Sequence, residues 1–168
     1  LPMGAKVDAG FSDQFERYAF VVLPDKRTFY IHKKALAPLP KEPQSEEKTR
    51  GLIVENASKY LNVQYRWGGK THAGIDCSGL AFMACHMAGI NIWRDADFDK
   101  TPRLREIERD AAQPGDLYFF SGHIAVAIGD GDFIHATAAE GKVTYGTFEP
   151  KSAFYRKWYD ENFIRAGS

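Results

Sequence analysis

Cysteine is scarce in this chain, and so are surplus charge and long apolar runs. Only Cys77 and Cys85 are present, and 22 basic residues balance 22 acidic ones. If both cysteines lie on one helix, eight positions apart, the helical rise separates them by about 12 Å, too far for a disulfide. No basic run favours binding to nucleic acid, and no apolar run approaches the ~20 residues of a membrane-spanning helix. We therefore expect no disulfide framework, no nucleic-acid partner and no membrane span in this chain.

The composition is that of a folded domain. The chain has 168 residues, of which 44% are hydrophobic and 14% aromatic, ample for a packed core. It contains no internal repeats and no low-complexity tracts. Its first residues, Leu1-Pro2-Met3-Gly4, carry no signal-peptide pattern and look like the middle of a longer protein. We expect one ordinary domain together with a fragment of another.

The N-terminal part reads as that fragment. Residues 15–23 and 28–31 alternate as strands do and are separated by a Pro-Asp turn, which predicts a β-hairpin. Such a hairpin is too small to be stable alone, so we interpret residues 1–36 as the end of a small β-barrel whose first part lies outside this chain. Residues 37–45 carry three prolines and predict a linker. The main domain is then expected over residues 46–168.

The main domain shows helices first and strands second. Ser45 is a good N-cap for a helix over residues 46–61. A second, apolar helix follows from position 77, and a short helix is predicted over residues 102–110. Strand patterns then occur at 117–120, 123–128, 133–137, 142–148 and 163–165. This order predicts an α+β fold with an antiparallel sheet.

Asp76-Cys77-Ser78-Gly79-Leu80 is the most informative stretch of the sequence. Asp76 is a good N-cap, which puts Cys77 in the first turn of the apolar helix. A thiol there lies beside unpaired backbone N–H groups and the positive end of the helix dipole, so we expect its pKa to be lowered. The alternative is a small buried residue that happens to carry sulfur, which is how we interpret Cys85.

Two histidines are predicted to lie side by side. His123 opens one strand, His135 lies in the next, and a tight turn over residues 129–132 joins them. Centred on that turn, the two residues fall nearly opposite each other. Taken alone, either one is explained better as an ordinary strand residue. Together with Cys77 they form a nucleophile, a base and an orienting group; an alternative would use the same three as zinc ligands.

Four sequence blocks, in order, resemble the signature blocks of the NlpC-type cell-wall peptidases over residues 46–168. They are Tyr65–Gly69, Asp76–Leu80, Gln113–Phe120, and His123–Val126 followed by His135-Ala136. The resemblance implies a papain-like cysteine peptidase with a nucleophile-bearing helix packed on an antiparallel sheet. It implies Cys77 as nucleophile, His123 as base and His135 as the third member, with no metal or cofactor. Residues 27–36 resemble, more weakly, the closing strand of a bacterial SH3-type barrel.

The resemblance also implies residues that touch substrate. Tyr65 matches a tyrosine near the oxyanion site, Trp67 a wall of the groove, and Asp76 and Ser78 flank the nucleophile. Asp95 matches a carboxylate that pairs with the free ammonium of an N-terminal L-alanine. The ordinary explanations are a packed loop aromatic for Tyr65, helix capping for Asp76 and a solvated acid for Asp95.

The activity implied is hydrolysis of the amide between D-γ-glutamate and a diamino acid in peptidoglycan stem peptides, with a murein tripeptide or tetrapeptide as the partner. Its implied location is the bacterial cell envelope, periplasm or exterior, with cytoplasmic recycling of wall peptides as the alternative. Two other functions remain open at this point. One is an amidase or acyltransferase on the same Cys–His scaffold, and the other is a non-catalytic wall-binding module.

Overall fold

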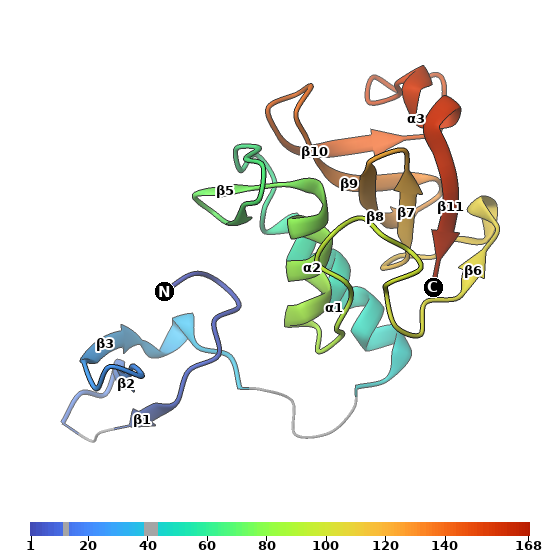
Figure 1. The fold of residues 1–168 in the computed structure, drawn as a ribbon. Helices are drawn as coiled ribbons and strands as arrows, with labels where there is room; N and C mark the ends of the chain where they lie inside the picture. The colour runs from blue at the N-terminus through green and yellow to red at the C-terminus, as the bar shows by residue number, and fades with distance from the viewer. Residues whose placement is uncertain (12–13, 39–43) are drawn as a thin grey trace. The chain divides into compact units, whose positions relative to one another are not determined.

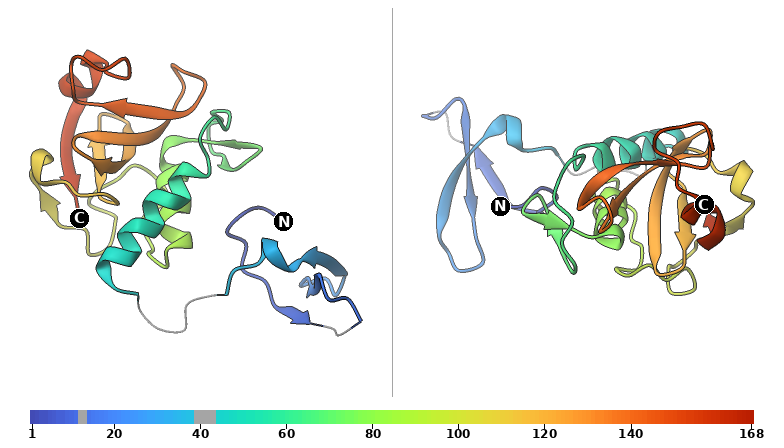
Figure 2. Two further views of the ribbon diagram at one scale, coloured as in Figure 1. Left: turned by 180° about the vertical axis from the view of Figure 1, so that it is seen from behind. Right: turned by 90° about the horizontal axis from the view of Figure 1, so that it is seen from above.

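The computed structural model describes residues 1–11, 14–38 and 44–168. The chain divides into an N-terminal unit and a second unit that comprises Gln44–Ser168 (Figures 1 and 2). Of the predicted linker 37–45, residues 39–43 lie outside the described part. Within the described part, no helix is long and apolar enough to cross a membrane.

The N-terminal unit contains a three-stranded antiparallel sheet in the order β1-β2-β3. The predicted hairpin is present as β2 (Tyr18–Val22) and β3 (Thr28–His32), and a 3₁₀ turn, Lys33–Ala35, follows β3. The turn between the strands places Lys26 at a positive φ of 68°. β1 (Ala9–Phe11) was not predicted and adds an edge strand to β2. The interpretation of this unit as part of an SH3-type barrel stays a prediction.

Two helices open the second unit. α1 (Glu46–Ser58) begins as predicted, because the Ser45 hydroxyl accepts a hydrogen bond from the Lys48 N–H. It ends three residues earlier than predicted, in a turn that places Asn62 at a positive φ of 65°. α2 (Cys77–Met87) is buried over most of its length and ends just before Gly89, at a φ of 87°. The short hairpin of β4 (Lys70–Thr71) and β5 (Gly74–Ile75) leads into α2.

A six-stranded antiparallel sheet forms the rest of the unit, in the order β10-β9-β8-β7-β11-β6. Its members are β6 (Glu106–Ile107), β7 (Leu117–Phe120), β8 (His123–Gly129), β9 (Asp132–Thr137), β10 (Lys142–Thr147) and β11 (Phe163–Gly167). α2 packs against β8 and β9, and α1 packs against α2 and β8 (Figure 1). This is the α+β fold expected, with helix α2, which begins at Cys77, packed on the sheet.

Two local predictions differ from the structure. The helix predicted over residues 102–110 is replaced by strand β6 and a 3₁₀ turn, Arg109–Ala111. The segment is extended because Ile107 pairs with Ala166 of β11 and the Arg105 N–H donates to the Ser168 carbonyl. A short helix that was not predicted, α3 (Lys157–Asn162), precedes β11.

The face of the sheet that carries the two histidines is lined by aromatic side chains. The buried cluster on this face comprises Tyr118, Phe120, Ala125, Ala127, Phe133, Tyr159 and Ala166. His135 lies two residues after Phe133 on β9, so the alternation of strand side chains puts both on this face. The rings of His135 and Phe133 are 5.2 Å apart in an edge-to-face arrangement. The cluster therefore encloses the imidazoles that the sequence predicted as a pair.

Candidate active site

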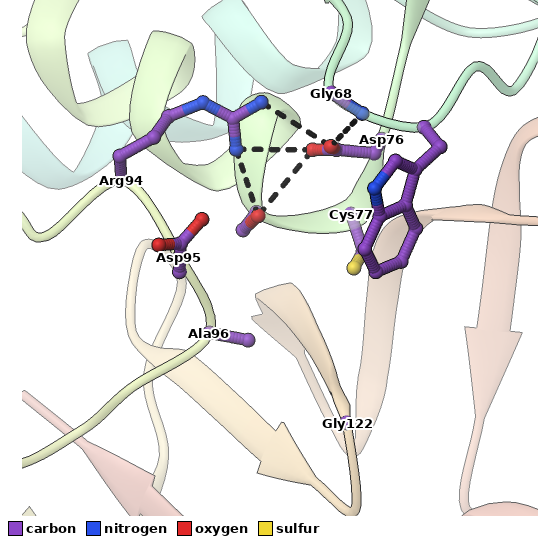
Figure 3. Close-up of a pocket in the computed structure, with 9 residues that line it drawn as sticks. Gly68, Asp76, Cys77, Arg94, Asp95, Ala96 and Gly122 are labelled. Atoms are coloured by element: carbon purple, nitrogen blue, oxygen red, sulfur yellow. Dashed lines mark hydrogen bonds and ion pairs between the residues drawn. The ribbon is translucent and has the colours of Figure 1, made fainter.

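Cys77 is the first residue of α2, and its side chain is 8% exposed. It lines a pocket of about 500 Å³ together with Trp67, Gly68, Asp76, Ser78, Arg94, Asp95, Ala96 and Gly122 (Figure 3). The backbone N–H groups of Ile124, Ser78 and Cys77 itself approach the sulfur atom. Ile124 directly follows His123, so the thiol lies beside the start of β8.

Asp76 holds the start of this helix in place. Its Oδ1 accepts hydrogen bonds from the Gly79 N–H at 2.6 Å and the Ser78 hydroxyl at 3.3 Å, while Oδ2 accepts from the Gly68 N–H at 2.7 Å. The Arg94 guanidinium donates to both oxygens, at 3.1 and 3.2 Å. Both oxygens of this 6%-exposed residue are thus occupied by protein groups. The arrangement supports helix capping for Asp76 rather than the substrate contact that the resemblance implied.

Arg94 joins three segments at this point. Besides Asp76, it donates to the Ser78 hydroxyl at 2.8 Å and to the Gly69 carbonyl at 3.1 Å (Figure 3). A Cβ atom on Gly79 would collide with the Gly69 carbonyl oxygen, so only glycine allows this close approach. The Gly-Gly turn, the helix tip and the loop after α2 are therefore held as one rigid wall of the pocket.

The expected lowering of the Cys77 pKa does not occur. Burial raises the pKa of this thiol, and the Asp76 carboxylate raises it further. The backbone N–H of Ile124 on β8, and then those of Ser78 and Cys77 at the helix start, act in the opposite direction but are outweighed. The sequence pattern revealed the helix end but not the depth of burial, which disfavours the charged thiolate. In the free protein we therefore infer a neutral thiol.

The two predicted imidazoles are in direct contact. His123 Nε2 and His135 Nδ1 are 2.8 Å apart, within hydrogen-bond distance. His123 is partly buried at the start of β8, whereas His135 is 1% exposed. Because its Nε2 faces His135, His123 has only its Nδ1 left for a thiol proton. The structure thus brings together the two residues that the sequence paired.

Their register differs slightly from the prediction. Val126 pairs with Ile134 and Ala127 with Phe133, so His135 lies diagonally across from His123 instead of opposite it. Diagonal neighbours on one face are still within reach of ring side chains. The connecting turn has positive φ at Asp130 and Gly131, 53° and 78°, as in a two-residue type I′ hairpin loop.

Burial lowers the pKa of both histidines, that of His123 to about 4 and that of His135 to about 3. The proximity of His123 contributes further to the lowering at His135, because two positive charges would repel each other. Near neutral pH both rings are therefore neutral. With the raised pKa of Cys77, this makes the resting site an uncharged thiol–imidazole arrangement.

The remaining predicted residues surround the thiol. Tyr65 is half-buried; burial raises its pKa, and the nearby Cys77 and Asp76 raise it further. Trp67 is 85% exposed on the rim of the pocket. Asp95 is exposed and lines the pocket, and in the described part of the chain nothing forms a hydrogen bond or ion pair with its carboxylate (Figure 3). A free carboxylate there is available to a ligand.

The geometry does not favour the zinc alternative. His123 and His135 turn nitrogen atoms toward each other, whereas ligands of one ion must direct their lone pairs to a common point. Across residues 1–11, 14–38 and 44–168, no group of three or more His, Cys, Asp or Glu side chains is arranged to hold a metal ion.

Two residues of α3 that sequence reasoning missed contact the histidine pair. The Trp158 ring lies 6.0 Å from the His123 ring, edge to face. The Tyr159 hydroxyl is 3.3 Å from His135 Nε2. The only sequence signal for them is a pair of adjacent aromatic residues just before the last strand, which does not by itself reveal the contact.

Comparison with known proteins identifies the family to which this chain belongs. The profile described as the NlpC/P60 family matches residues 62–164, which include Cys77, His123 and His135. The chain belongs to the NlpC/P60 family. This is a family of peptidoglycan hydrolases and endopeptidases, and its solved structures share the papain-like α+β fold seen here. The family resemblance and the fold class predicted from the sequence are both confirmed.

Individual relatives are longer than this chain. Dipeptidyl-peptidase 6 of Lysinibacillus sphaericus is 37% identical over 129 residues, covering 76% of this chain and 48% of its own. The γ-D-glutamyl-L-lysine dipeptidyl-peptidase of Bacillus cereus is 32% identical over 102 residues, covering 54% and 29%. An NlpC/P60 family protein of Bacillus cereus has a similar fold, with a TM-score of 0.78 at 23% identity, over 96% of this chain and 53% of that one. The chain thus spans about half or less of these relatives.

Proposed function

We propose that this protein is a cysteine endopeptidase that hydrolyses the amide between D-γ-glutamate and a diamino acid in peptidoglycan stem peptides. The observation that carries the proposal is the position of Cys77 at the tip of α2. Its thiol lines an open pocket and lies beside the backbone N–H of Ile124, the residue that follows His123 of the hydrogen-bonded pair His123–His135. The name of the 32%-identical Bacillus cereus relative, a γ-D-glutamyl-L-lysine dipeptidyl-peptidase, supports the choice of bond. Acting on wall peptides, the enzyme would belong to the cell envelope.

The neutral resting state defines the first chemical step. His123 Nδ1 takes the proton from the Cys77 thiol as the sulfur atom attacks the carbonyl carbon of the γ-glutamyl amide. Proton transfer then accompanies attack, because the separated thiolate–imidazolium pair is disfavoured by burial. The carbonyl oxygen becomes an oxyanion, which the backbone N–H groups at the start of α2 and the Tyr65 hydroxyl would stabilise.

The second half of the reaction returns the proton. His123 Nδ1–H protonates the amine of the diamino acid as the C–N bond breaks, leaving a thioester on Cys77. Water then loses a proton to His123 and attacks the thioester carbonyl. The thiolate leaves and regains that proton, which restores the neutral pair. His135 keeps the His123 ring in position and stabilises it when it is charged.

Asp95 is proposed to bind the free ammonium of the N-terminal L-alanine. Its carboxylate lines the same pocket as the thiol and forms no hydrogen bond or ion pair within the described residues (Figure 3). By contrast, the carboxylate of Asp76 is fully occupied and leaves no oxygen for a substrate. We assign Trp67 to the rim of the substrate groove and Ser78 to the wall beside the nucleophile.

The test is a digest of synthetic L-Ala-γ-D-Glu-diamino acid tripeptide, followed by mass spectrometry. We expect release of L-Ala-D-Glu by the parent protein and none by Cys77→Ala. Cys85→Ala is the matched control, because this second buried thiol lies on the same helix away from the pocket; it should retain activity. Absence of cleavage by folded protein would reject the proposal in favour of an amidase, an acyltransferase or a non-catalytic wall-binding module.

The ammonium assignment is tested in the same digest. An N-acetylated tripeptide and an Asp95→Asn variant should each raise KM strongly, because each removes one charge of the pair. If the acetylated and free peptides are cleaved equally well, Asp95 has no role in recognising the amine, although the peptidase assignment stands.

A further inference from the structure

The chain of hydrogen bonds that begins at His123 extends one residue beyond His135. The Tyr159 hydroxyl lies 3.3 Å from His135 Nε2, and His135 Nδ1 lies 2.8 Å from His123 Nε2. In the described residues, His135 Nε2 has no other partner within hydrogen-bond distance. We propose that Tyr159 is a positioning residue whose oxygen accepts the His135 Nε2–H and thereby holds the histidine pair in its reactive tautomer. This inference rests on the proposed cysteine-peptidase function.

The direction of the hydrogen bonds follows from the chemistry required of His123. To accept the thiol proton, His123 Nδ1 must be unprotonated, so its hydrogen is on Nε2. That Nε2–H donates to His135 Nδ1, which must then be the unprotonated nitrogen of His135. The hydrogen of His135 is consequently on Nε2 and needs an acceptor, for which the Tyr159 oxygen is in place.

An acceptor for the His135 Nε2–H is needed most when His123 is charged. An imidazolium carries hydrogens on both nitrogens, so His123 Nε2 can only donate to His135. His135 must then donate through Nε2, and the opposite direction of the chain is forbidden. His135 is 1% exposed and Tyr159 6% exposed, so water has little access to replace the phenol oxygen. Without it, the charged intermediate would contain a buried, unpaired N–H, a costly arrangement.

The fold fixes Tyr159 at this place. Its backbone N–H donates to the Arg156 carbonyl at 2.9 Å, which begins α3. Asp160, the next residue, accepts hydrogen bonds from Arg109 at 2.8 Å and from the Tyr155 hydroxyl at 2.9 Å. The Tyr159 ring packs on Phe133, with 5.1 Å between ring centroids, and so it cannot swing away without disturbing the core.

The experiment compares Tyr159→Phe with Tyr118→Phe. Tyr118 is 1% exposed in the same aromatic cluster, and none of the described contacts joins its hydroxyl to a histidine. Each variant loses one phenol hydroxyl from this cluster, so Tyr118→Phe controls for the loss of the hydroxyl itself. We expect Tyr159→Phe to lower kcat by roughly ten- to a hundredfold, the range for an unpaired buried donor, with KM unchanged. Tyr118→Phe should stay within about twofold of the parent.

A spectroscopic measurement separates this role from a merely structural one. Long-range ¹H–¹⁵N spectra of histidine-labelled protein report which ring nitrogen carries the hydrogen. The parent and Tyr118→Phe should show His135 protonated at Nε2, and Tyr159→Phe should show loss of that tautomer. An unchanged His135 spectrum in Tyr159→Phe would overturn the inference. This readout needs no substrate, so it remains decisive even if no stem peptide is cleaved and the proposed function fails.

A double-mutant comparison completes the test. If Tyr159 acts through His135, replacing it with Phe in a His135→Asn background should cause no further loss of kcat. An equal fold-loss in both backgrounds would show that Tyr159 acts independently of His135 and would reject the proposal.

Discussion

The two sides of the site are stabilised differently. On the helix side, charged and polar side chains surround the start of α2 at Cys77, whereas on the sheet side aromatic rings pack against His123 and His135. Asp76, Arg94 and Ser78 form a network of charge-assisted hydrogen bonds around the start of α2. The histidines instead lie against Phe120 and Phe133, and within the described residues no carboxylate forms a hydrogen bond or ion pair with them.

The two kinds of interaction have different effects: one fixes a position and the other sets a protonation state. Charged groups fix the position of Cys77, since salt bridges and caps are directional. Burial favours the neutral form of His123, because an apolar environment disfavours the imidazolium. Mutations in the charged network should therefore change the free energy of unfolding. Mutations of the buried histidines should change how that free energy depends on pH.

The largest effect is expected from Asp76→Ala. This change removes the α2 cap and leaves the Arg94 guanidinium, 29% exposed, without its ion-pair partner. We expect a loss of about 3–5 kcal/mol in the free energy of unfolding, measured by urea denaturation. Asp76→Asn keeps a capping side chain and should lose less, because asparagine caps helices about as well as aspartate.

The control for this prediction is Glu55→Ala, which breaks an exposed pair with Lys59 on α1 at 2.7 Å. Such pairs contribute about 0–1 kcal/mol. If Glu55→Ala costs as much as Asp76→Ala, the charged network at the helix tip has no special part in the fold.

A smaller effect is expected from lowering the pH. Burial places the pKa values of His123 and His135 at about 4 and about 3 in the folded protein, below the ordinary value of 6.5. Between these values the unfolded chain binds more protons than the folded one, so stability falls as the pH falls from about 6.5 towards 4. Urea midpoints across this range should decrease, and they should decrease less in His135→Asn. Parallel pH profiles for parent and variant would contradict the prediction.

The smallest effect is expected from Tyr60→Phe. Tyr60 is fully buried, and its hydroxyl is the one buried side-chain polar atom without a hydrogen-bond partner in the described residues. Because removing an unpaired buried hydroxyl relieves a desolvation cost, stability should be unchanged or higher by up to about 1 kcal/mol. Thermal unfolding measures this, and a clear loss of stability would show that the hydroxyl has a partner in solution. Comparing Tyr60→Phe with Tyr159→Phe distinguishes a hydroxyl without a hydrogen-bond partner from one that contacts His135.

The local features of this site were predictable where one short pattern decides the outcome. Asp76 before an apolar run marked the start of α2, and the turn at Asp130-Gly131 marked the hairpin that pairs the histidines. Each depends on neighbours within a few residues, where capping and turn preferences act. The prediction of an α+β fold followed from the order of such patterns.

The features that were missed depend on distant contacts. The segment around Ile107 is a strand only because Ala166 of β11, far along the chain, pairs with it. The raised pKa of Cys77 arises from packing around the helix tip. Tyr159 acquires its contact with His135 because Arg109 and Tyr155 hold Asp160. None of these features can be predicted from the residues that are close to it in the sequence.

The two-residue loop at Asp130-Gly131 limits the insertions that this hairpin can accept during evolution. Side chains alternate between the two faces of a strand, so inserting a single residue that shifts the register would turn His135 away from His123. A lengthened turn is compatible with activity only when the strands keep their pairing and bulge out the extra residues. The length of this loop therefore fixes the register of the two histidines. It restricts which insertions the hairpin tolerates, although the loop does not line the pocket.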